Sequence, residues 1–115
     1  MLLRDIQRLE HIIDYCEDID EALNLTDRSC EKFASDKTVQ YAVSFSILQI
    51  GELAGKLSDE LRTATKEKID WPAIKGLRNI IVHDYGEIRL SVIWNIAVND
   101  IPELKAFCEG YLSEL

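Results

Sequence analysis

Apolar residues recur at intervals of three and four along most of the chain, which is the periodicity of amphipathic helices. In residues 2–24, charged side chains fill most of the positions between them. We therefore predict that an amphipathic helix covers this range. Its apolar stripe consists of Leu2, Ile6, Leu9, Ile13 and Cys16, widened by Ile12, Ile19 and Leu23.

A second and more apolar stripe predicts a second helix that extends to about residue 61. Ser35 or Asp36 can cap its start, because a short polar side chain can accept a hydrogen bond from the first helical turn. Residues 25–35 have weak periodicity and turn formers, so we predict a connection there. The stripe consists of Val39, Val43, Ile47, Ile50, Ala54, Leu57 and Leu61, and Ala42, Phe45, Leu48 and Leu53 extend it sideways. This width indicates that the helix touches neighbours on two sides.

Gly51 and Gly55 lie four residues apart on this second helix. Each glycine costs a helix about 1 kcal/mol relative to alanine. Such a cost suggests that another helix packs closely at this point, either within the fold or across a dimer. We favour the dimer slightly, although crowded cores also select glycine.

The last third of the chain predicts two more helical segments. Asp70 and Pro72 give a cap followed by proline in the first turn, so a third helix should run from there to about Tyr85 and stop at Gly86. A fourth segment begins near Ile88, and Pro102 should kink or restart it near Asp100. Its stripe consists of Leu90, Ile93, Ala97, Ile101, Leu104, Cys108 and Tyr111. No strand pattern competes, so we predict an all-α, antiparallel four- to five-helix bundle that forms one domain over residues 1–115.

Composition narrows the class of protein. A chain of 115 residues, 47% of them hydrophobic, can form one core but is too short for a multidomain enzyme. No apolar run approaches the ~18 residues that span a bilayer, and the charged N-terminal segment is unlike a signal peptide, so we expect a cytoplasmic protein without a membrane segment. Cys16, Cys30 and Cys108 form no CxxC pair, so we expect three reduced, buried thiols rather than disulfides or a zinc site.

The net charge of -8 would ordinarily count against a nucleic-acid partner. The charge is unevenly distributed, however, because residues 62–89 hold six basic and four acidic residues, whereas the remainder holds seven basic and seventeen acidic ones. A locally basic segment fits a phosphate site of limited extent. On charge alone, a random fluctuation on a solvated surface fits about as well.

The predicted third helix concentrates the residue types that can carry chemistry. It contains Arg78, Asn79, His83, Asp84 and Tyr85, whereas Gly-rich phosphate loops, nucleophile elbows and HExxH motifs are absent from the sequence. At about 100° per residue, Arg78 and His83 lie about 140° apart on a regular helix. They can meet if the helix ends at His83, or if two copies of the helix face each other across a two-fold axis.

These side chains suit cleavage of RNA without a metal or cofactor. In that reaction the ribose 2′-hydroxyl attacks the adjacent phosphorus and leaves a 2′,3′-cyclic phosphate. His83 can act as general base or acid, Arg78 can bind the phosphate oxygens where charge develops, and Asn79 can orient either group. The structural alternative is that His83 caps a helix end beside Asp84 and that Arg78 pairs with a carboxylate. We assign such a structural role to His11.

The octapeptide R-N-I-I-V-H-D-Y, Arg78 to Tyr85, matches the pattern R-x-x-x-x-H-x-Y of the HepT family in the HEPN superfamily. The polar residue after the arginine, Asn79, also fits. The segments ILQIGELAGKLSDEL, WPAIKGLRN and WNIAVNDIPELKAF are similar to HepT-type sequence as well. The resemblance therefore covers nearly the whole chain.

The resemblance implies a homodimeric HEPN-like bundle that is the toxin of a two-gene toxin-antitoxin module. It implies a metal-independent ribonuclease with Arg78 and His83 catalytic in a cleft at the dimer interface, supported by Asn79 and Asp84. It further implies an antitoxin of the MntA type, a minimal nucleotidyltransferase that transfers AMP from ATP to Tyr85. The added charge and bulk beside Arg78 would repel and block the RNA.

Two other readings stay open at the level of sequence. One is a non-catalytic HEPN-type interaction module that binds, or is modified by, a nucleotidyltransferase partner. The other is a helical subunit that helps such a nucleotidyltransferase bind another substrate. The acidic surface favours docking to a basic face of a partner, whereas the presence of both Arg78 and His83 favours the nuclease. A neighbouring nucleotidyltransferase gene would support the toxin-antitoxin and partner readings alike.

Overall fold

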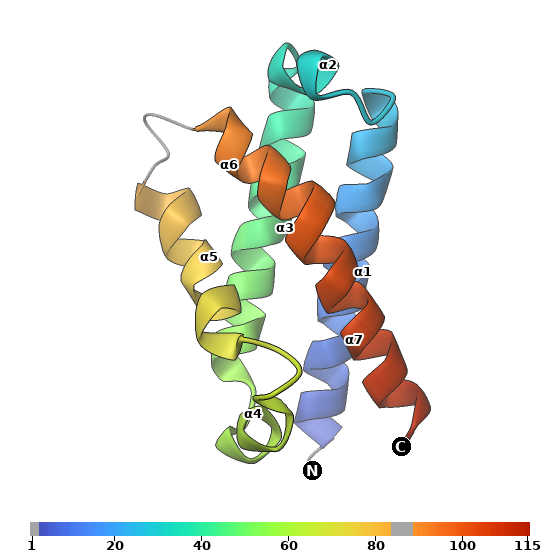
Figure 1. Cartoon of the computed structure of the whole chain (residues 1–115), viewed down its shortest axis with the longest axis vertical. Helices are drawn as coiled ribbons and strands as arrows, with labels where there is room; N and C mark the ends of the chain where they lie inside the picture. Colours follow the sequence, from blue (N-terminus) through green and yellow to red (C-terminus); the bar gives the residue numbers. More distant parts are fainter. Residues whose placement is uncertain (1–2, 84–88) are drawn as a thin grey trace.

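A computed structural model describes residues 3–83 and 89–115, with His83 described by its backbone alone. Over these residues the chain is helical and contains no strand, which confirms the all-α prediction (Figure 1). The elements are α1 (Leu3–Leu25), α2 (Cys30–Ala34), α3 (Lys37–Lys56), α4 (Asp59–Thr65), α5 (Trp71–His83), α6 (Leu90–Asn95), a π-helical turn (Ile96–Asp100) and α7 (Ile101–Ser113). No helix in the described ranges is long and apolar enough to cross a membrane.

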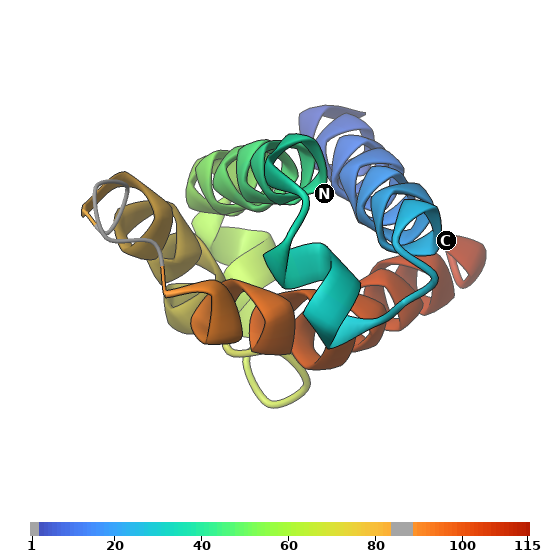
Figure 2. The same ribbon diagram turned by 90° about the horizontal axis from the view of Figure 1, so that it is seen from above.

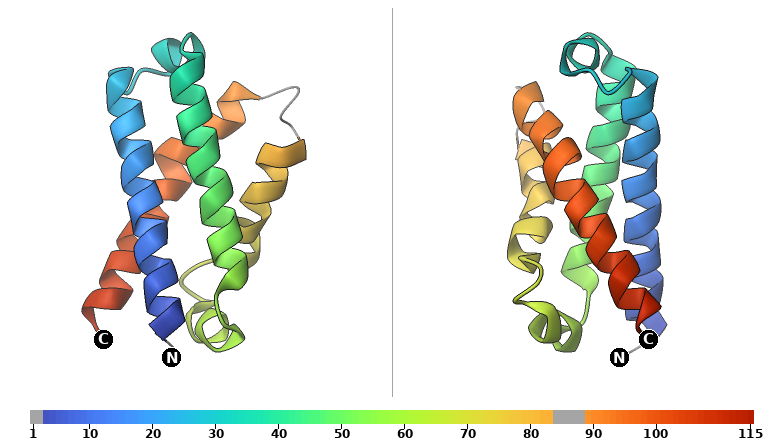
Figure 3. Two further views of the ribbon diagram at one scale, coloured as in Figure 1. Left: turned by 180° about the vertical axis from the view of Figure 1, so that it is seen from behind. Right: turned by 45° about the vertical axis from the view of Figure 1, so that its right-hand side comes forward.

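The long helices alternate in direction along the chain. Helices α1 and α3 lie side by side and antiparallel, and α5 packs antiparallel to α3 on its other flank (Figure 3). The α6–α7 arm crosses obliquely and packs on α1 (Figure 2). Helix α3 therefore has α1 and α5 as neighbours on two sides, as its wide apolar surface predicts. The short helices α2 and α4 lie at opposite ends of the molecule (Figure 1).

The prediction that the second helix extends to about residue 61 is wrong, because this part of the chain forms two helices. Helix α3 ends at Lys56, and Ser58 caps α4 by accepting a hydrogen bond from Leu61 N at 3.1 Å. Asp5 on α1 is buried and accepts hydrogen bonds from Ser58 N at 3.0 Å and from Ser58 Oγ at 2.6 Å. The chain thus turns at Ser58 because a carboxylate from α1 accepts hydrogen bonds from the backbone and side chain of this cap residue.

The other helix starts follow local signals. Asp36 caps α3 and Asp70 accepts from Ala73 N at 3.1 Å in the first turn of α5, as predicted. Residues 25–35, predicted as a connection, contain the short helix α2 with Ser29 as its cap. The expected interruption near Asp100 is confirmed, since the π-helical turn ends there and Pro102 lies in the first turn of α7. The predicted stop at Gly86 lies outside the described residues.

The start of α5 is fixed by the core. The Trp71 side chain is 2% exposed, and its indole N–H donates to Thr65 Oγ1 at 2.8 Å. Its ring meets Phe107 of α7 edge to face, with the centroids 5.9 Å apart. Trp71 therefore ties α5 to both α4 and α7, which gives the helix that carries the candidate motif a rigid base.

The prediction of three buried thiols is correct for two of them. Cys16 and Cys108 are buried, and burial raises the pKa of each thiol to about 12. Cys30 is exposed, because it is the first residue of the short helix α2 at the end of the bundle. The sequence could not reveal this exposure, since residues 25–35 show little periodicity.

Candidate functional site

The candidate site lies where α5 crosses α3. A β-carbon added at Gly51 would lie 2.8 Å from the backbone nitrogen of Arg78 and 3.0 Å from its Cβ. Only a glycine lets the two helices approach this closely, so Gly51 sets the position of Arg78. At Gly55 an added β-carbon would lie 3.5 to 3.7 Å from the side-chain carbons of Lys75, which is ordinary contact. The slight preference for a dimer contact at these glycines is corrected, because α5 of the same chain packs there.

The Arg78 side chain extends over this crossing at the protein surface. It is 47% exposed, and its Nε forms an ion pair with Glu52 Oε1 of α3. Its Nη1 also donates a long hydrogen bond, 3.4 Å, to Oδ1 of Asn79. Arg78 therefore does pair with a carboxylate, as the structural alternative proposes. In this position the guanidinium lies beside Asn79.

A shallow cavity of about 260 Å³ opens beside Arg78. Three cationic side chains and a single carboxylate line it, so it has the charge that a phosphate group requires. The lining residues are Gly51, Glu52, Gly55, Lys56, Lys75, Arg78 and Asn79. Of the predicted site residues, the structure brings Arg78 and Asn79 together in this cavity.

Sequence reasoning missed Glu52, Lys56 and Lys75 as members of the site. Lys75 lies one helical turn before Arg78 and carries the same charge, a signal that could have identified it. Glu52 and Lys56 reach the cavity only through the α3–α5 crossing. Nothing in the local sequence indicates that crossing beyond the two glycines.

His83 is the last residue of α5, five residues after Arg78. On a helix this spacing separates the two side chains by about 140° around the axis. The predicted residues Asp84 and Tyr85 lie outside the described residues, as does the side chain of His83. The meeting of Arg78 with His83 therefore stays a prediction.

An apolar strip runs along α3 toward the Arg78–Glu52 pair. Its members are Tyr41, Phe45 and Leu48, which share the helix face of Glu52. Phe45 is 57% exposed and Tyr41 51% exposed, which is unusual for large aromatic side chains. We call these three residues the α3 aromatic strip. The end of α5 also exposes Val82.

His11 is exposed on α1, on the polar side where the sequence places it. It lies outside the lining of the Arg78 cavity.

Residues 12–110 match the family described as "Ribonuclease HepT-like". The chain is 34% identical over 97 residues to a protein of Thermococcus cleftensis named "Probable ribonuclease HepT", covering 80% of this chain and 87% of that protein. It is 33% identical over 97 residues to a provisionally named RNase of Caldanaerobacter subterraneus subsp. tengcongensis, covering 84% of each. A provisionally named RNase of Methanocaldococcus jannaschii is 31% identical over 114 residues, which are 97% of this chain and 95% of the relative. No solved structure matches the chain.

Proposed function

The chain belongs to the HepT-like ribonuclease family, and on that premise we propose that it is a metal-independent endoribonuclease, the toxin of a toxin-antitoxin module. The observation that carries the proposal is the position of Arg78, which is held beside Asn79 in a cationic cavity at the surface. It acts on cellular RNA in the cytoplasm as a single HEPN-like domain. The experiment that tests the activity is RNA cleavage in EDTA.

The proposed reaction uses side chains alone. His83, as general base, takes the proton of the ribose 2′-hydroxyl, and the 2′-oxygen attacks the adjacent phosphorus. The bond from phosphorus to the 5′-oxygen breaks, and that oxygen receives a proton from the imidazolium of a protonated His83. A 2′,3′-cyclic phosphate remains. Arg78 stabilises the charge that develops on the phosphate oxygens. Because Glu52 engages Nε, the terminal guanidinium nitrogens are the donors toward the phosphate, while Asn79 and Asp84 have supporting roles.

We further propose that the active form is a homodimer that joins through the α3 aromatic strip. Two observations support this arrangement. The strip exposes large aromatic rings in line with Glu52, the partner of Arg78, and a single helix separates Arg78 from His83 by about 140°. Two copies that pair along the strip would bring the α5 helices toward each other. Arg78 and His83 of both chains would then share one cleft.

Phe45→Glu is expected to convert the dimer to a monomer and to abolish RNA cleavage, because a charge would be buried in the apolar interface. Sedimentation equilibrium would measure the mass, and circular dichroism would confirm that the helices persist. The matched control is Leu25→Glu, since Leu25 is 77% exposed at the end of α1 and is not a member of the strip. A dimeric Phe45→Glu protein would show that the strip is not the interface.

Regulation is proposed to occur at Tyr85. A nucleotidyltransferase antitoxin of the MntA type would catalyse attack of the Tyr85 phenol oxygen on the α-phosphorus of ATP, with loss of the phenol proton and release of pyrophosphate. Tyr85 lies seven residues after Arg78, so a continued helix would place the two nearly in line. The adenylate would thus add charge and bulk near the phosphate site.

Tyr85→Phe is expected to resist this modification, because phenylalanine has no hydroxyl oxygen to accept AMP. Intact-mass spectrometry after incubation with the antitoxin and ATP would detect the added adenylate. Tyr111→Phe, which removes a partly exposed phenol on α7, is the control and should be modified like the wild type. An adenylate that persists on Tyr85→Phe would place the modification at another residue.

One observation favours a second candidate function. The ion pair between Arg78 and Glu52 already gives the arginine a partner within the fold, and the chain has a net charge of -8. Both facts suit a non-catalytic module that docks to a basic face of a nucleotidyltransferase. Such a module would bind its partner and be modified by it, yet the unmodified dimer would leave RNA intact.

A further inference from the structure

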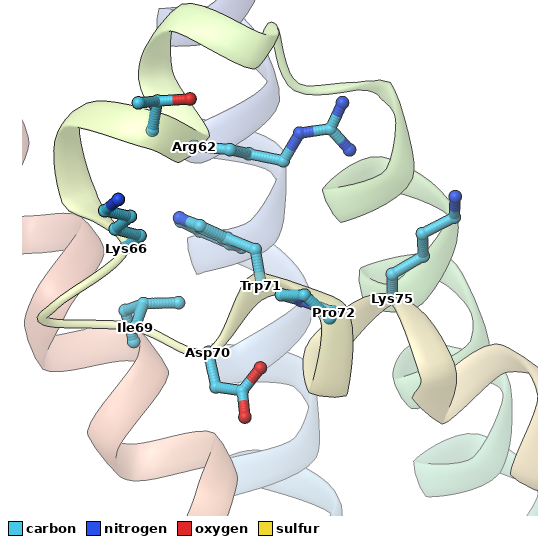
Figure 4. Close-up of a pocket in the computed structure, with 8 residues that line it drawn as sticks. Arg62, Lys66, Ile69, Asp70, Trp71, Pro72 and Lys75 are labelled. Atoms are coloured by element: carbon cyan, nitrogen blue, oxygen red, sulfur yellow. The ribbon is translucent and has the colours of Figure 1, made fainter.

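A second and larger cavity lies between α4 and the first turn of α5 (Figure 4). Its volume is about 650 Å³. Three cationic side chains and a single carboxylate line it, in a protein whose net charge is -8. The lining residues are Arg62, Thr63, Lys66, Ile69, Asp70, Trp71, Pro72 and Lys75. We call this cavity the α4–α5 pocket.

Little negative charge is available in this pocket to repel a bound anion. The carboxylate of Asp70 accepts a hydrogen bond from Ala73 N at the start of α5, so it is engaged in capping. Arg62 pairs with Asp59 at 2.7 Å, but the Asp59 side chain is 96% exposed. Ion pairs this exposed contribute little to stability, so a phosphate can replace Asp59 as the partner of Arg62 at small cost. Lys66 and Lys75 are exposed.

The α4–α5 pocket adjoins the Arg78 cavity at Lys75, which lines both. Lys75 precedes Arg78 by one helical turn, about 4.5 Å along the axis of α5. The Lys75 stem lies over Gly55, where an added β-carbon would be only 3.5 Å from its Cε. A row of positive charge therefore leads from Arg78 past Lys75 to Arg62 and Lys66.

The pocket can hold phosphates, but in the described part of the chain it offers no exposed aromatic ring on which a base can stack. Trp71 is the aromatic residue among the described lining residues, and its side chain is 2% exposed with its N–H donated to Thr65. The recognising groups are thus flexible cations, which bind the backbone of a nucleic acid rather than its bases. Binding of this kind depends strongly on salt and weakly on sequence.

We propose that the α4–α5 pocket binds phosphates of the RNA strand that flank the cleaved bond. This inference rests on the proposed ribonuclease function, and it adds a subsite that lengthens the recognised RNA. Arg62 and Lys66 are positioning residues, since they hold the strand while the chemistry occurs at the Arg78 cavity. A dinucleotide would fill that cavity without reaching the pocket, whereas a longer strand would occupy both.

The test compares Arg62→Gln/Lys66→Gln with wild type in the binding of a fluorescent 2′-O-methyl RNA of about ten nucleotides, within the site sizes of single-strand binders. The missing 2′-hydroxyls prevent cleavage. Each lost phosphate contact reduces the magnitude of the negative slope of log K against log salt by about 0.7, so this magnitude should be about 1.4 smaller in the double variant. Cleavage of an unmodified dinucleotide should be unchanged.

The control is Arg28→Gln/Lys32→Gln, which removes the same charge from the α2 end of the molecule, opposite α4 (Figure 1). It should keep the wild-type slope. Equal slopes in wild type and Arg62→Gln/Lys66→Gln, with wild type still cleaving RNA, would overturn the pocket proposal alone. Wild type that neither binds nor cleaves RNA would instead refute the proposed function. Loss of ATP binding in the variant with an unchanged RNA slope would assign the pocket to a free nucleotide and also overturn the proposal.

Discussion

Arg78→Ala is expected to lower the rate of RNA cleavage by about 10²- to 10³-fold, the loss typical of removing one donor that stabilises transition-state charge. The physical reason is that the guanidinium is the cation held beside Asn79 in the candidate cavity. Single-turnover cleavage of a labelled RNA would measure the loss. Arg78→Lys should recover part of the rate, because it retains the charge but lacks the planar fork of donors.

The ion pair with Glu52 provides the control for this prediction. Glu52→Gln breaks the same pair while it leaves the arginine in place, so it reproduces whatever stability the pair contributes. Both residues are partly exposed, and such pairs contribute little to stability. A purely structural arginine would make Glu52→Gln and Arg78→Ala equally harmful to cleavage. Wild-type cleavage by a folded Arg78→Ala dimer would exclude Arg78 from the chemistry.

Gly51→Ala is expected to lower the free energy of unfolding by about 1–3 kcal/mol, the usual cost of overpacking. The new methyl group would lie 2.8 Å from the backbone nitrogen of Arg78, so α5 must move away from α3. This shift would also displace Arg78 and reduce RNA cleavage. Urea denaturation followed by circular dichroism would measure the stability, and the cleavage assay would report the displacement.

Gly55→Ala is the matched control, one turn further along the same helix. Its methyl group would meet the flexible Lys75 side chain at 3.5 Å or more, which is ordinary contact. Helix propensity alone then predicts a gain of up to about 1 kcal/mol. The two substitutions should therefore change the free energy of unfolding in opposite directions. Equal gains for both would show that α3 and α5 do not approach at Gly51 as closely as the structure has them.

Much of the fold could be predicted from the sequence because the signals are local. Asp36 and Asp70 cap helices through hydrogen bonds to residues three positions ahead, so their roles are readable in a short window. The break between α3 and α4 was missed because it depends on Asp5, 53 residues from Ser58. Apolar periodicity continued through that break and concealed it. Only the folded chain shows that a carboxylate of α1 stabilises the turn.

In the candidate site, too, local features could be predicted from the sequence, whereas features that depend on the folded chain could not. Arg78 and Asn79 could be identified because the motif is continuous in sequence, and the two glycines indicated a close approach of some helix. The identity of that helix, and with it the role of Glu52 and Lys56, depends on how α3 and α5 cross. Sequence periodicity specifies the apolar face of a helix but not the neighbour that covers it. Phe45 was likewise predicted as part of a packed face, whereas it is exposed in the chain.

The most direct test of the central claim is cleavage of total and transfer RNA in EDTA by unmodified wild-type and His83→Ala dimers, with analysis of the product ends. The account predicts 2′,3′-cyclic phosphate ends from wild type and no cleavage by His83→Ala, which should remain dimeric. Intact RNA with confirmed, unmodified wild-type dimer would contradict the account and favour the interaction module. Dissociation of His83→Ala into monomers would show that His83 is structural.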